Sequence, residues 1–242
     1  MRTIRIHTPE PLAAAGETVL PPAASNHLVR VLRQGPGAPV ILFNGDNQEY
    51  AAILDTADPR AARLRITDCR LADRESPLAV HLLAGISKGE RMDYTVQKAV
   101  ELGVASIQPV FCAATVVRLD ADKRERRRAH WQEIAVSACE QCGRNRVPPV
   151  LPPVDFAQAL AKAAAGLRLV LHGQAAAGLR DLDRPNAPVT LLIGPEGGLS
   201  PAEIAAAEAA GFRPLRLGPR VLRTETAGVA ALAALQALWG DW

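Results

Sequence analysis

The sequence predicts an α/β protein in which a C-terminal domain built on a parallel sheet follows a small β-barrel or sandwich. From residue 78 onward, strand-like runs alternate with segments of helix length, a pattern typical of a parallel sheet covered on both faces. The first 70 residues instead carry several short strand-like runs. Between these regions, Ala72–Pro77 is polar and ends in proline, as linkers do. We therefore expect domains at residues 1–72 and 73–242.

Short strands dominate the expected N-terminal domain. Turn signals separate them, among them Gly35-Pro36-Gly37 and Asn44-Gly45-Asp46-Asn47. The segment Ser25–Leu32 (SNHLVRVL) is expected as a short helix with Ser25 as its cap. So many short strands in so few residues favour a small barrel or sandwich. The strands are expected at Thr3–His7, Pro39–Phe43, Glu49–Leu54 and Arg63–Cys69.

Five strands and five helices are expected to alternate in the C-terminal domain. The strands are expected at Ala79–Ile86, Ser106–Phe111, Arg168–His172, Pro188–Ile193 and Pro214–Leu217. The helices are expected at Met92–Leu102, Lys123–Cys142, Phe156–Ala165, Pro201–Ala210 and Glu225–Trp239. Ligands of such sheets bind beyond the carboxyl ends of the strands, so the loops that follow strands are the candidate sites.

Composition excludes several classes of protein. The 242 residues are 48% hydrophobic and 22% charged, which is close to the average of folded globular proteins and excludes bulk disorder. No apolar run approaches the ~18 residues of a membrane span. No apolar signal core follows the first arginines, so we expect a cytoplasmic location. Lys and Arg number 28 against 25 Asp and Glu, a net charge of +3 that neither requires nor excludes a nucleic-acid partner.

Two glycine-bearing loops near the C-terminus follow expected strands. Gly194-Pro195-Glu196-Gly197-Gly198 leads into a helix whose start is specified by Ser200 as N-cap, Pro201 and Glu203, a capping box. The second, Gly218–Ala227 (GPRVLRTETA), leads into a helix for which Thr224 is the expected cap. Neither loop matches the P-loop or the dinucleotide fingerprint. Neighbouring parallel strands would place the two loops side by side.

Positive charge collects at three further places. Lys88 and Arg91 lie at a helix start, where the helix dipole favours acids, so a function such as gripping phosphate would explain them. Arg144 and Arg146 lie in a loop, which suits phosphate or base contacts. The third place is the run from Arg118 to Arg128, which is most simply a solvated helix face.

A metal or redox site is not expected. Cys139-Glu140-Gln141-Cys142 matches C-x-x-C but has no second pair and no suitably spaced histidine. A thioredoxin-like pair would lie at a helix start, whereas this pair ends one. The five histidines are dispersed and form no recognisable metal or Ser-His-Asp pattern.

Several of these motifs together resemble one family. The chain resembles the RsmE family, the bacterial 16S rRNA (uracil-N3)-methyltransferases of the SPOUT superfamily, and the resemblance spans the whole chain. Cys142 stands where a small polar residue such as serine is expected, which disfavours a role for the C-x-x-C pair. The motifs are His27–Arg33 (HLVRVLR), Lys88–Asp93 (KGERMD), Gln97–Gly103 (QKAVELG), Glu140–Pro148 (EQCGRNRVP), Gly194–Gly198 (GPEGG) and Leu222–Ala227 (LRTETA).

The resemblance implies a fold and an activity that pattern analysis does not show. The N-terminal domain would be a PUA-like β-barrel that helps to hold rRNA, and the C-terminal domain would be a SPOUT domain with a deep trefoil knot. The knot would form the pocket for S-adenosylmethionine. The chain would act as a homodimer, without metal or membrane, and would methylate N3 of uridine 1498 of 16S rRNA in the 30S subunit.

The resemblance also suggests roles for individual residues. Arg223 is expected to stabilise the uracil anion, and either Glu196 or Glu225 to accept its proton, although a hydroxide or no dedicated base is equally compatible. RNA contacts are expected from Arg30, Arg33, Lys88, Arg91, Arg144 and Arg146. Cofactor contacts are expected from His172, Gly173, Gly194, Pro195, Glu196, Gly197, Leu217, Gly218, Val221, Leu222, Thr224 and Thr226.

Two alternatives stay open at the level of sequence. One is another SPOUT RNA methyltransferase that modifies a ribose 2′-hydroxyl or a different base position. The other is a non-catalytic rRNA-binding assembly factor, which would keep the arginines but would not need the cofactor loops.

Overall fold

The computed structural model describes residues 3–115 and 120–242, which form two compact units. The first unit extends to Glu75 and also includes Cys139–Val147, and the second comprises Ser76–Ala138 and Pro148–Trp242. The first stretch of the first unit ends three residues beyond the expected boundary at residue 72. The segment Cys139–Val147, expected in the C-terminal domain, belongs to the first unit instead.

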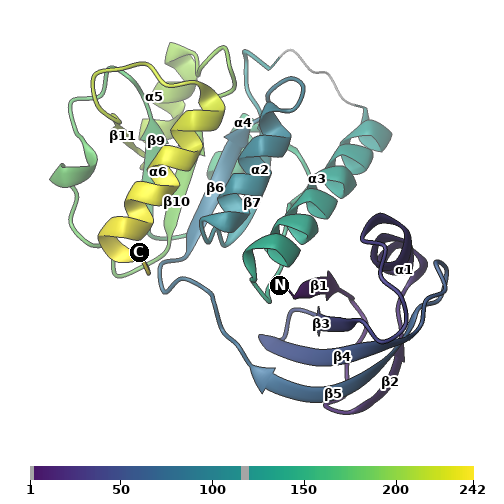
Figure 1. Ribbon diagram of the computed structural model, residues 1–242. Helices are drawn as coiled ribbons and strands as arrows, with labels where there is room; N and C mark the ends of the chain where they lie inside the picture. The colour runs from purple at the N-terminus through teal and green to yellow at the C-terminus, as the bar shows by residue number, and fades with distance from the viewer. Residues whose placement is uncertain (1–2, 116–119) are drawn as a thin grey trace. The chain divides into compact units, whose positions relative to one another are not determined.

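The first unit is built on one five-stranded sheet, in the order β1-β3-β4-β5-β2 (Figure 1). β1 and β3 are parallel, and the other neighbours are antiparallel. Two register shifts between β4 and β5 mark bulges, which bend strands and increase their twist. The strands are β1 (Ile4–His7), β2 (Gly16–Val19), β3 (Pro39–Phe43), β4 (Gln48–Thr56) and β5 (Arg63–Leu71).

The connection from β2 to β3 differs from the sequence prediction. A short helix α1 (Pro22–Asn26) begins before Ser25 and continues as a π-helical turn, His27–Val31. Ser25 is buried, and its hydroxyl donates to the carbonyl of Leu20 at 2.9 Å and accepts from the amide of Ala62 at 3.0 Å. Ser25 is therefore not a cap, because its oxygen joins this helix to the start of β5.

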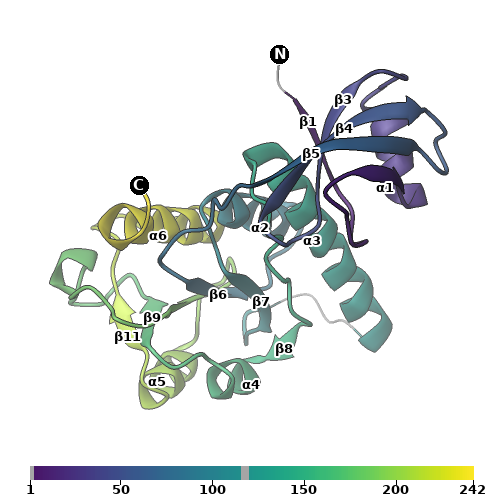
Figure 2. The same ribbon diagram turned by 90° about the horizontal axis from the view of Figure 1, so that it is seen from below.

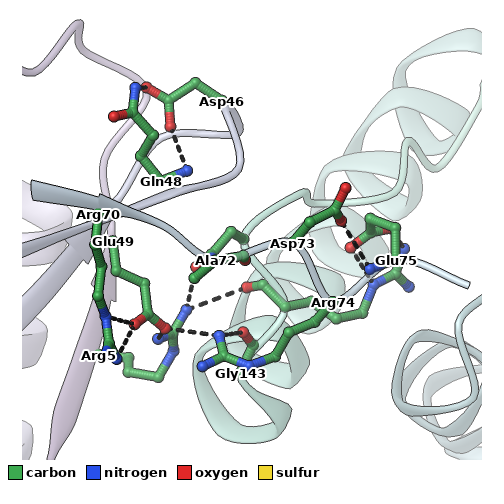
Figure 3. A network of polar contacts seen from close by, with 12 residues as sticks. Arg5, Asp46, Gln48, Glu49, Arg70, Ala72, Asp73, Arg74, Glu75 and Gly143 are labelled. Atoms are coloured by element: carbon green, nitrogen blue, oxygen red, sulfur yellow. Dashed lines mark hydrogen bonds and ion pairs between the residues drawn. The ribbon is translucent and has the colours of Figure 1, made fainter.

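A buried carboxylate organises one end of the first unit (Figure 3). Glu49 is 2% exposed and accepts hydrogen bonds from Arg5, Arg70 and Arg74. Burial by itself raises the pKa of Glu49, but the hydrogen bonds from Arg74, Arg70 and Arg5 outweigh it and lower the pKa from its ordinary 4.5 to about 2. Glu49 is thus a fixed anion that holds three guanidinium groups around it.

The same network attaches the segment that follows helix α3 (Ala121–Cys142). The Arg5 guanidinium donates to the side-chain oxygen of Asn145, and the side-chain amide of Asn145 donates to the carbonyl of Ala72 at 2.6 Å. Arg74 donates to the carbonyl of Gly143 at 2.8 Å, as Figure 3 shows, and Arg144 forms an ion pair with Glu75. Side chains that start far apart in the sequence therefore meet around Glu49.

The second unit contains a six-stranded sheet in the order β11-β9-β10-β6-β7-β8, parallel throughout. This confirms the predicted parallel sheet. Every strand of this sheet except β8 was expected, and β8 has only two residues. The strands are β6 (Val80–Gly85), β7 (Ser106–Phe111), β8 (Val154–Asp155), β9 (Leu167–Leu171), β10 (Val189–Ile193) and β11 (Arg213–Leu215).

Helices cover both faces of this sheet. Helices α2 and α6 pack together on one face and α4 and α5 on the other, as Figure 2 shows. α4 ends at Ala161, before the expected Ala165, and the Arg168 guanidinium binds the carbonyls of Ala163 and Ala164 beyond its end. The helices are α2 (Arg91–Glu101), the first part of α3, α4 (Phe156–Ala161), the short 3-10 turn Leu179–Asp181, α5 (Pro201–Ala209) and α6 (Thr224–Trp239).

We predict that Glu49→Gln destabilises the first unit by about 3 kcal/mol at neutral pH, because a pKa lowered from 4.5 to about 2 corresponds to that free energy. The contribution is fully present above pH 4.5 and disappears as the pH falls toward 2, since a depressed carboxyl pKa favours the folded state only while the group is ionised. Hydrogen exchange in β4 and β5 at several pH values measures both effects.

Asp55→Asn is the matched control for this prediction. Asp55 pairs with Arg65 on the same sheet, but both side chains are more than one third exposed, so its loss should cost less than about 1 kcal/mol. Equal protection in wild type and Glu49→Gln at neutral pH would show that Glu49 does not stabilise this unit.

Candidate functional site

A cavity of about 610 Å³ lies at the carboxyl edge of the parallel sheet, a size typical of small-molecule sites. Its walls come from the ends of β9, β10 and β11 and from the start of α6 (Figure 1). This is the edge at which parallel α/β sheets bind ligands. Leu217, Leu222 and Ile204 supply apolar lining, and the glycine-rich loops expose backbone groups.

Close contact between two backbones fixes the loop after β10. A Cβ atom on Gly85, the last residue of β6, would lie 2.4 Å from the nitrogen of Pro195. A Cβ atom on Gly194 would lie 3.0 Å from the carbonyl carbon of Gly198, so the loop also folds tightly on itself. Glycine is therefore required at Gly85 for steric reasons.

The start of α6 is bonded to this loop. The hydroxyl of Thr224 donates to the carbonyl of Gly194 at 2.5 Å. Thr224 was expected to cap the helix, and this is wrong: it is the first residue of α6, and Arg223 occupies the N-cap position without a side-chain capping bond. The hydroxyl joins the loops after β10 and β11 instead. The capping box predicted at Ser200 and Glu203 is confirmed.

The two C-terminal loops meet for a different reason from the one predicted. β10 and β11 are not neighbours, because β9 lies between them. The loop after β9 therefore belongs to the site as well, through His172 and Gly173. The segment after β11 also runs beside the connection from β9 to β10, since the amide of Arg216 donates to the carbonyl of Ala177 at 2.9 Å. Three consecutive strands in the sheet thus contribute to one cavity.

Charged groups meet at one wall of the cavity. The Arg91 guanidinium lies between two carboxylates, 3.7 Å from Glu196 and 3.9 Å from Glu225. The second carboxylate oxygen of Glu225 is buried and has no hydrogen-bond partner among the described residues. One arginine therefore faces two carboxylates, and one of these retains an unused acceptor.

The two carboxylates differ in their surroundings. Burial raises the pKa of Glu196, but hydrogen bonds from its own backbone, from the amide of Lys88 and from Ser87, together with the charge of Arg91, lower it overall. The Lys88 amide donates to Glu196 at 3.3 Å. Glu196 is thus stabilised as an anion, which makes it a weak base.

The structure brings together most of the residues expected at a cofactor site. Arg223, Glu196 and Glu225, expected to be catalytic, all line the cavity. Thr226 is not among the lining residues, although Glu225 and Ala227 on either side of it are. The expected cofactor residues in the lining are His172, Gly173, Gly194, Pro195, Glu196, Gly197, Leu217, Gly218, Val221, Leu222 and Thr224.

Sequence reasoning missed several residues of the lining. Leu199 and Ile204 belong to the capped start of α5, and their apolar character alone gives no reason to separate them from the core. Arg216 and Arg220 lie in the loop after β11, where the concentration of arginines was the available signal.

The residues expected to contact RNA do not form one group. Arg30, Arg33 and Arg146 are exposed in the first unit, and Lys88 and Arg91 are exposed in the second. Arg144 is only 5% exposed and pairs with Glu75, which disfavours a direct phosphate contact for its side chain. Arg118, part of the basic run, lies outside the described residues.

The cysteines are free thiols. Burial raises the pKa of Cys139 to about 12, so its metal-binding thiolate form is disfavoured. No group of three or more metal-ligating side chains occurs within residues 3–115 and 120–242. Over the same residues, none of the helices has the length and apolar character that spanning a membrane requires.

Comparisons with known proteins agree that this chain is similar to methyltransferases that act on RNA. The family model for an RNA methyltransferase domain matches residues 74–236, and that for an RNA methyltransferase PUA domain matches residues 20–67. The ribosomal RNA small subunit methyltransferase E of Buchnera aphidicola (from Schizaphis graminum) is 34% identical over 90% of this chain and 89% of its own.

Two solved structures are similar over the whole of both chains. One is a methyltransferase from Legionella pneumophila in complex with bound S-adenosylmethionine, with 43% identity and a TM-score of 0.97. The other is a ribosomal RNA small subunit methyltransferase E from Neisseria gonorrhoeae bound to S-adenosylmethionine, with 41% identity and a TM-score of 0.92.

We predict that Gly85→Ala destabilises the second unit by about 2 kcal/mol or more, because the added methyl group overlaps the backbone of Pro195 and Gly194. Thermal unfolding followed by tryptophan fluorescence measures the change. Gly173→Ala is the control, since a Cβ atom there meets nothing within 4 Å. An unfolding midpoint for Gly85→Ala equal to that of the control would contradict the proposed steric constraint.

Proposed function

Because the chain belongs to the RNA methyltransferase family that includes ribosomal RNA small subunit methyltransferase E, we propose that it methylates N3 of uridine 1498 of 16S rRNA with S-adenosylmethionine. The main support is the cavity at the carboxyl edge of the sheet. It lies in a fold that matches two S-adenosylmethionine-bound methyltransferases over the whole chain, at 43% and 41% identity. The target base and its N3 position rest on the resemblance of the motifs.

The residues of the cavity suit S-adenosylmethionine. Backbone groups of Gly194, Gly197 and Gly218 can approach an adenine edge closely, and Leu217 and Leu222 offer apolar surfaces for its faces. At Gly194 the loop leaves little room for a side chain, because a Cβ atom there would lie 3.0 Å from Gly198 and Leu199. We assign His172, Gly173, Pro195, Glu196, Val221 and Thr224 to the same wall.

When bound, S-adenosylmethionine supplies a methyl group on a positively charged sulfur. The residues of the chain must then position the base and remove a proton, because neutral N3 of uracil is a poor nucleophile. Positioning alone can contribute several kcal/mol, up to ~7–11 in ideal cases. To Arg223, which lines the cavity at the start of α6, we assign the stabilisation of negative charge that develops on the uracil oxygens.

Glu225 is the better supported proton acceptor. Its buried oxygen lacks a hydrogen-bond partner in the described structure, so it has capacity to accept one. Glu196, by contrast, has a lowered pKa and is already bound by backbone amides. Arg91 lies between the two groups and would hold both carboxylates in place during transfer.

We extend the proposal to the partner, the location and the chain path. The substrate would be the assembled 30S subunit in the cytoplasm, and the active form would be a homodimer. The segment after β11 would form the threaded part of a trefoil knot, which is supported by its backbone contact with Ala177. Three of the arginines expected to contact RNA, Arg30, Arg33 and Arg146, are exposed in the first unit and would contact the rRNA.

Incubation of the purified chain with unmodified 30S particles and methyl-labelled S-adenosylmethionine tests the function directly. We expect label in one nucleotide, recovered as 3-methyluridine after digestion and mapped to uridine 1498. Label on a ribose or on another base would assign a different methyltransferase activity. Absence of both labelling and cofactor binding, the latter measured by calorimetry, would indicate a non-catalytic RNA-binding protein.

Substitution of the two carboxylates separates their roles. We predict that Glu225→Gln lowers single-turnover methyl transfer at saturating cofactor by about 100-fold or more, the size of a general-base contribution. Glu196→Gln should lower it by less than about tenfold, because a carboxyl group with a lowered pKa is a weak base. The reverse ranking would assign the proton to Glu196, and two small effects would exclude a dedicated carboxylate base.

A further inference from the structure

A second hollow, of about 430 Å³, lies on the N-terminal half of α3 and outside the cavity described above. Its lining consists of Lys123, Arg126, Arg127 and His130. These positions are spaced by three, one and three residues, so they share one face of the helix. The hollow is therefore lined by one lysine, two arginines and one histidine.

The acidic residues of this part of α3 neutralise only some of its basic residues. Asp120 pairs with Lys123 at 3.0 Å, and Glu125 pairs with Arg128. Arg126 contributes to lowering the pKa of Asp120, but neither Arg126 nor Arg127 has a carboxylate within 4.0 Å in the part of the chain that the structure describes. Two guanidinium groups thus line the hollow without a carboxylate ion-pair partner among residues 3–115 and 120–242.

The hollow is held at the same edge of the sheet as the main cavity. The guanidinium of Arg124 lies over the ring of Phe111, the last residue of β7, at 4.4 Å. The imidazole of His130 lies 3.0 Å from the carboxylate of Asp93, which also accepts from the indole of the buried Trp131. Asp93 is two residues beyond Arg91, which lines the main cavity.

α2 and α3 accordingly connect the two sites within the second unit. Figure 1 shows the two helices side by side, with the start of each at the carboxyl edge of the sheet. Arg91 faces the main cavity, and Asp93 fixes the position of His130 in the hollow. The two sites therefore lie on neighbouring helices, with the His130–Asp93 contact between them.

We propose that this hollow is a second anchoring site for the sugar-phosphate backbone of the RNA substrate, next to the nucleotide that enters the main cavity. This inference rests on the proposed function. Guanidinium groups bind phosphate through paired, charge-assisted hydrogen bonds, and such contacts fix the register of a nucleic acid without reading its sequence. Anchoring a neighbouring phosphate would help to hold a strand whose base is unstacked for reaction.

The test compares two double variants that each remove two positive charges. Arg126→Gln with Arg127→Gln alters the hollow. Lys162→Gln with Arg213→Gln alters exposed residues at the end of α4 and the start of β11, on the opposite edge of the sheet. The dissociation constants of protein-free 16S rRNA and of unmodified 30S particles are measured from about 50 to 200 mM salt, with the affinity for S-adenosylmethionine as a separate readout.

We expect the hollow variant to bind both RNA probes roughly tenfold more weakly at 0.1 M salt. The slope of log affinity against log salt should become shallower by about 1 to 2, because one or two phosphate contacts are lost. The control variant should match wild type, and all three proteins should bind S-adenosylmethionine equally. Methyl transfer by the hollow variant should recover at high RNA concentration, since the chemical groups are intact.

Any other result contradicts either the anchoring site or the proposed function. Equal slopes and affinities for the two variants would overturn the anchoring site while leaving the proposed function intact. A loss seen with 30S particles but not with protein-free 16S rRNA would overturn it in favour of contact with a ribosomal protein. Failure of wild type to bind S-adenosylmethionine would overturn the proposed function alone, provided that the hollow variant still bound RNA more weakly than the control.

Discussion

The close approach of two backbones, at the end of β6 and at the start of the loop after β10, is the constraint on which the candidate site depends. Gly85 permits that approach because any side chain would overlap Pro195. The carbonyl of Gly194 is then placed to accept from the hydroxyl of Thr224, which sets where α6 begins. Arg223 and Glu225 flank Thr224, so their positions follow from the same contact. The absence of a side chain at Gly85 thus allows the end of β6, the loop after β10 and the start of α6 to meet.

Charge is used differently in the two units. In the first unit, the buried Glu49 forms ion pairs with three arginines, so its charge stabilises the fold. In the second, Arg91 stands between two carboxylates at distances too long for hydrogen bonds, and one carboxylate oxygen lacks a partner within the described structure. Incomplete pairing of this kind is costly in a core but useful where a substrate must be bound and deprotonated.

Local signals predicted the elements well and their arrangement less well. β3 and β7 match the expected ranges to the residue, and the capping box of α5 is as expected, because apolar runs and short-range hydrogen bonds determine these features. β2 was missed because GETV has no apolar alternation. Both expected hydroxyl caps were wrong, and each hydroxyl has a distant partner that no local pattern indicates: Ser25 accepts from the amide of Ala62, and Thr224 donates to the carbonyl of Gly194.

The site was predictable as a set of loops but not as a geometry. The strand order, with β9 between β10 and β11, depends on how the whole second unit packs, so the contribution of the loop after β9 could be named only from the resemblance. The burial of Arg144 was equally hidden, since its partner Glu75 lies 69 positions earlier. Both errors concern long-range pairing rather than residue type.

The discontinuity of the first unit has a consequence for biosynthesis. Asn145, which binds Arg5 in β1 and the backbone of Ala72 just after β5, leaves the translating ribosome long after both of these residues. The five strands are therefore made first, and the unit gains the contacts of Asn145 only after about three fifths of the polypeptide has been synthesised. A fragment that stops at residue 75 would keep all five strands but lack these contacts.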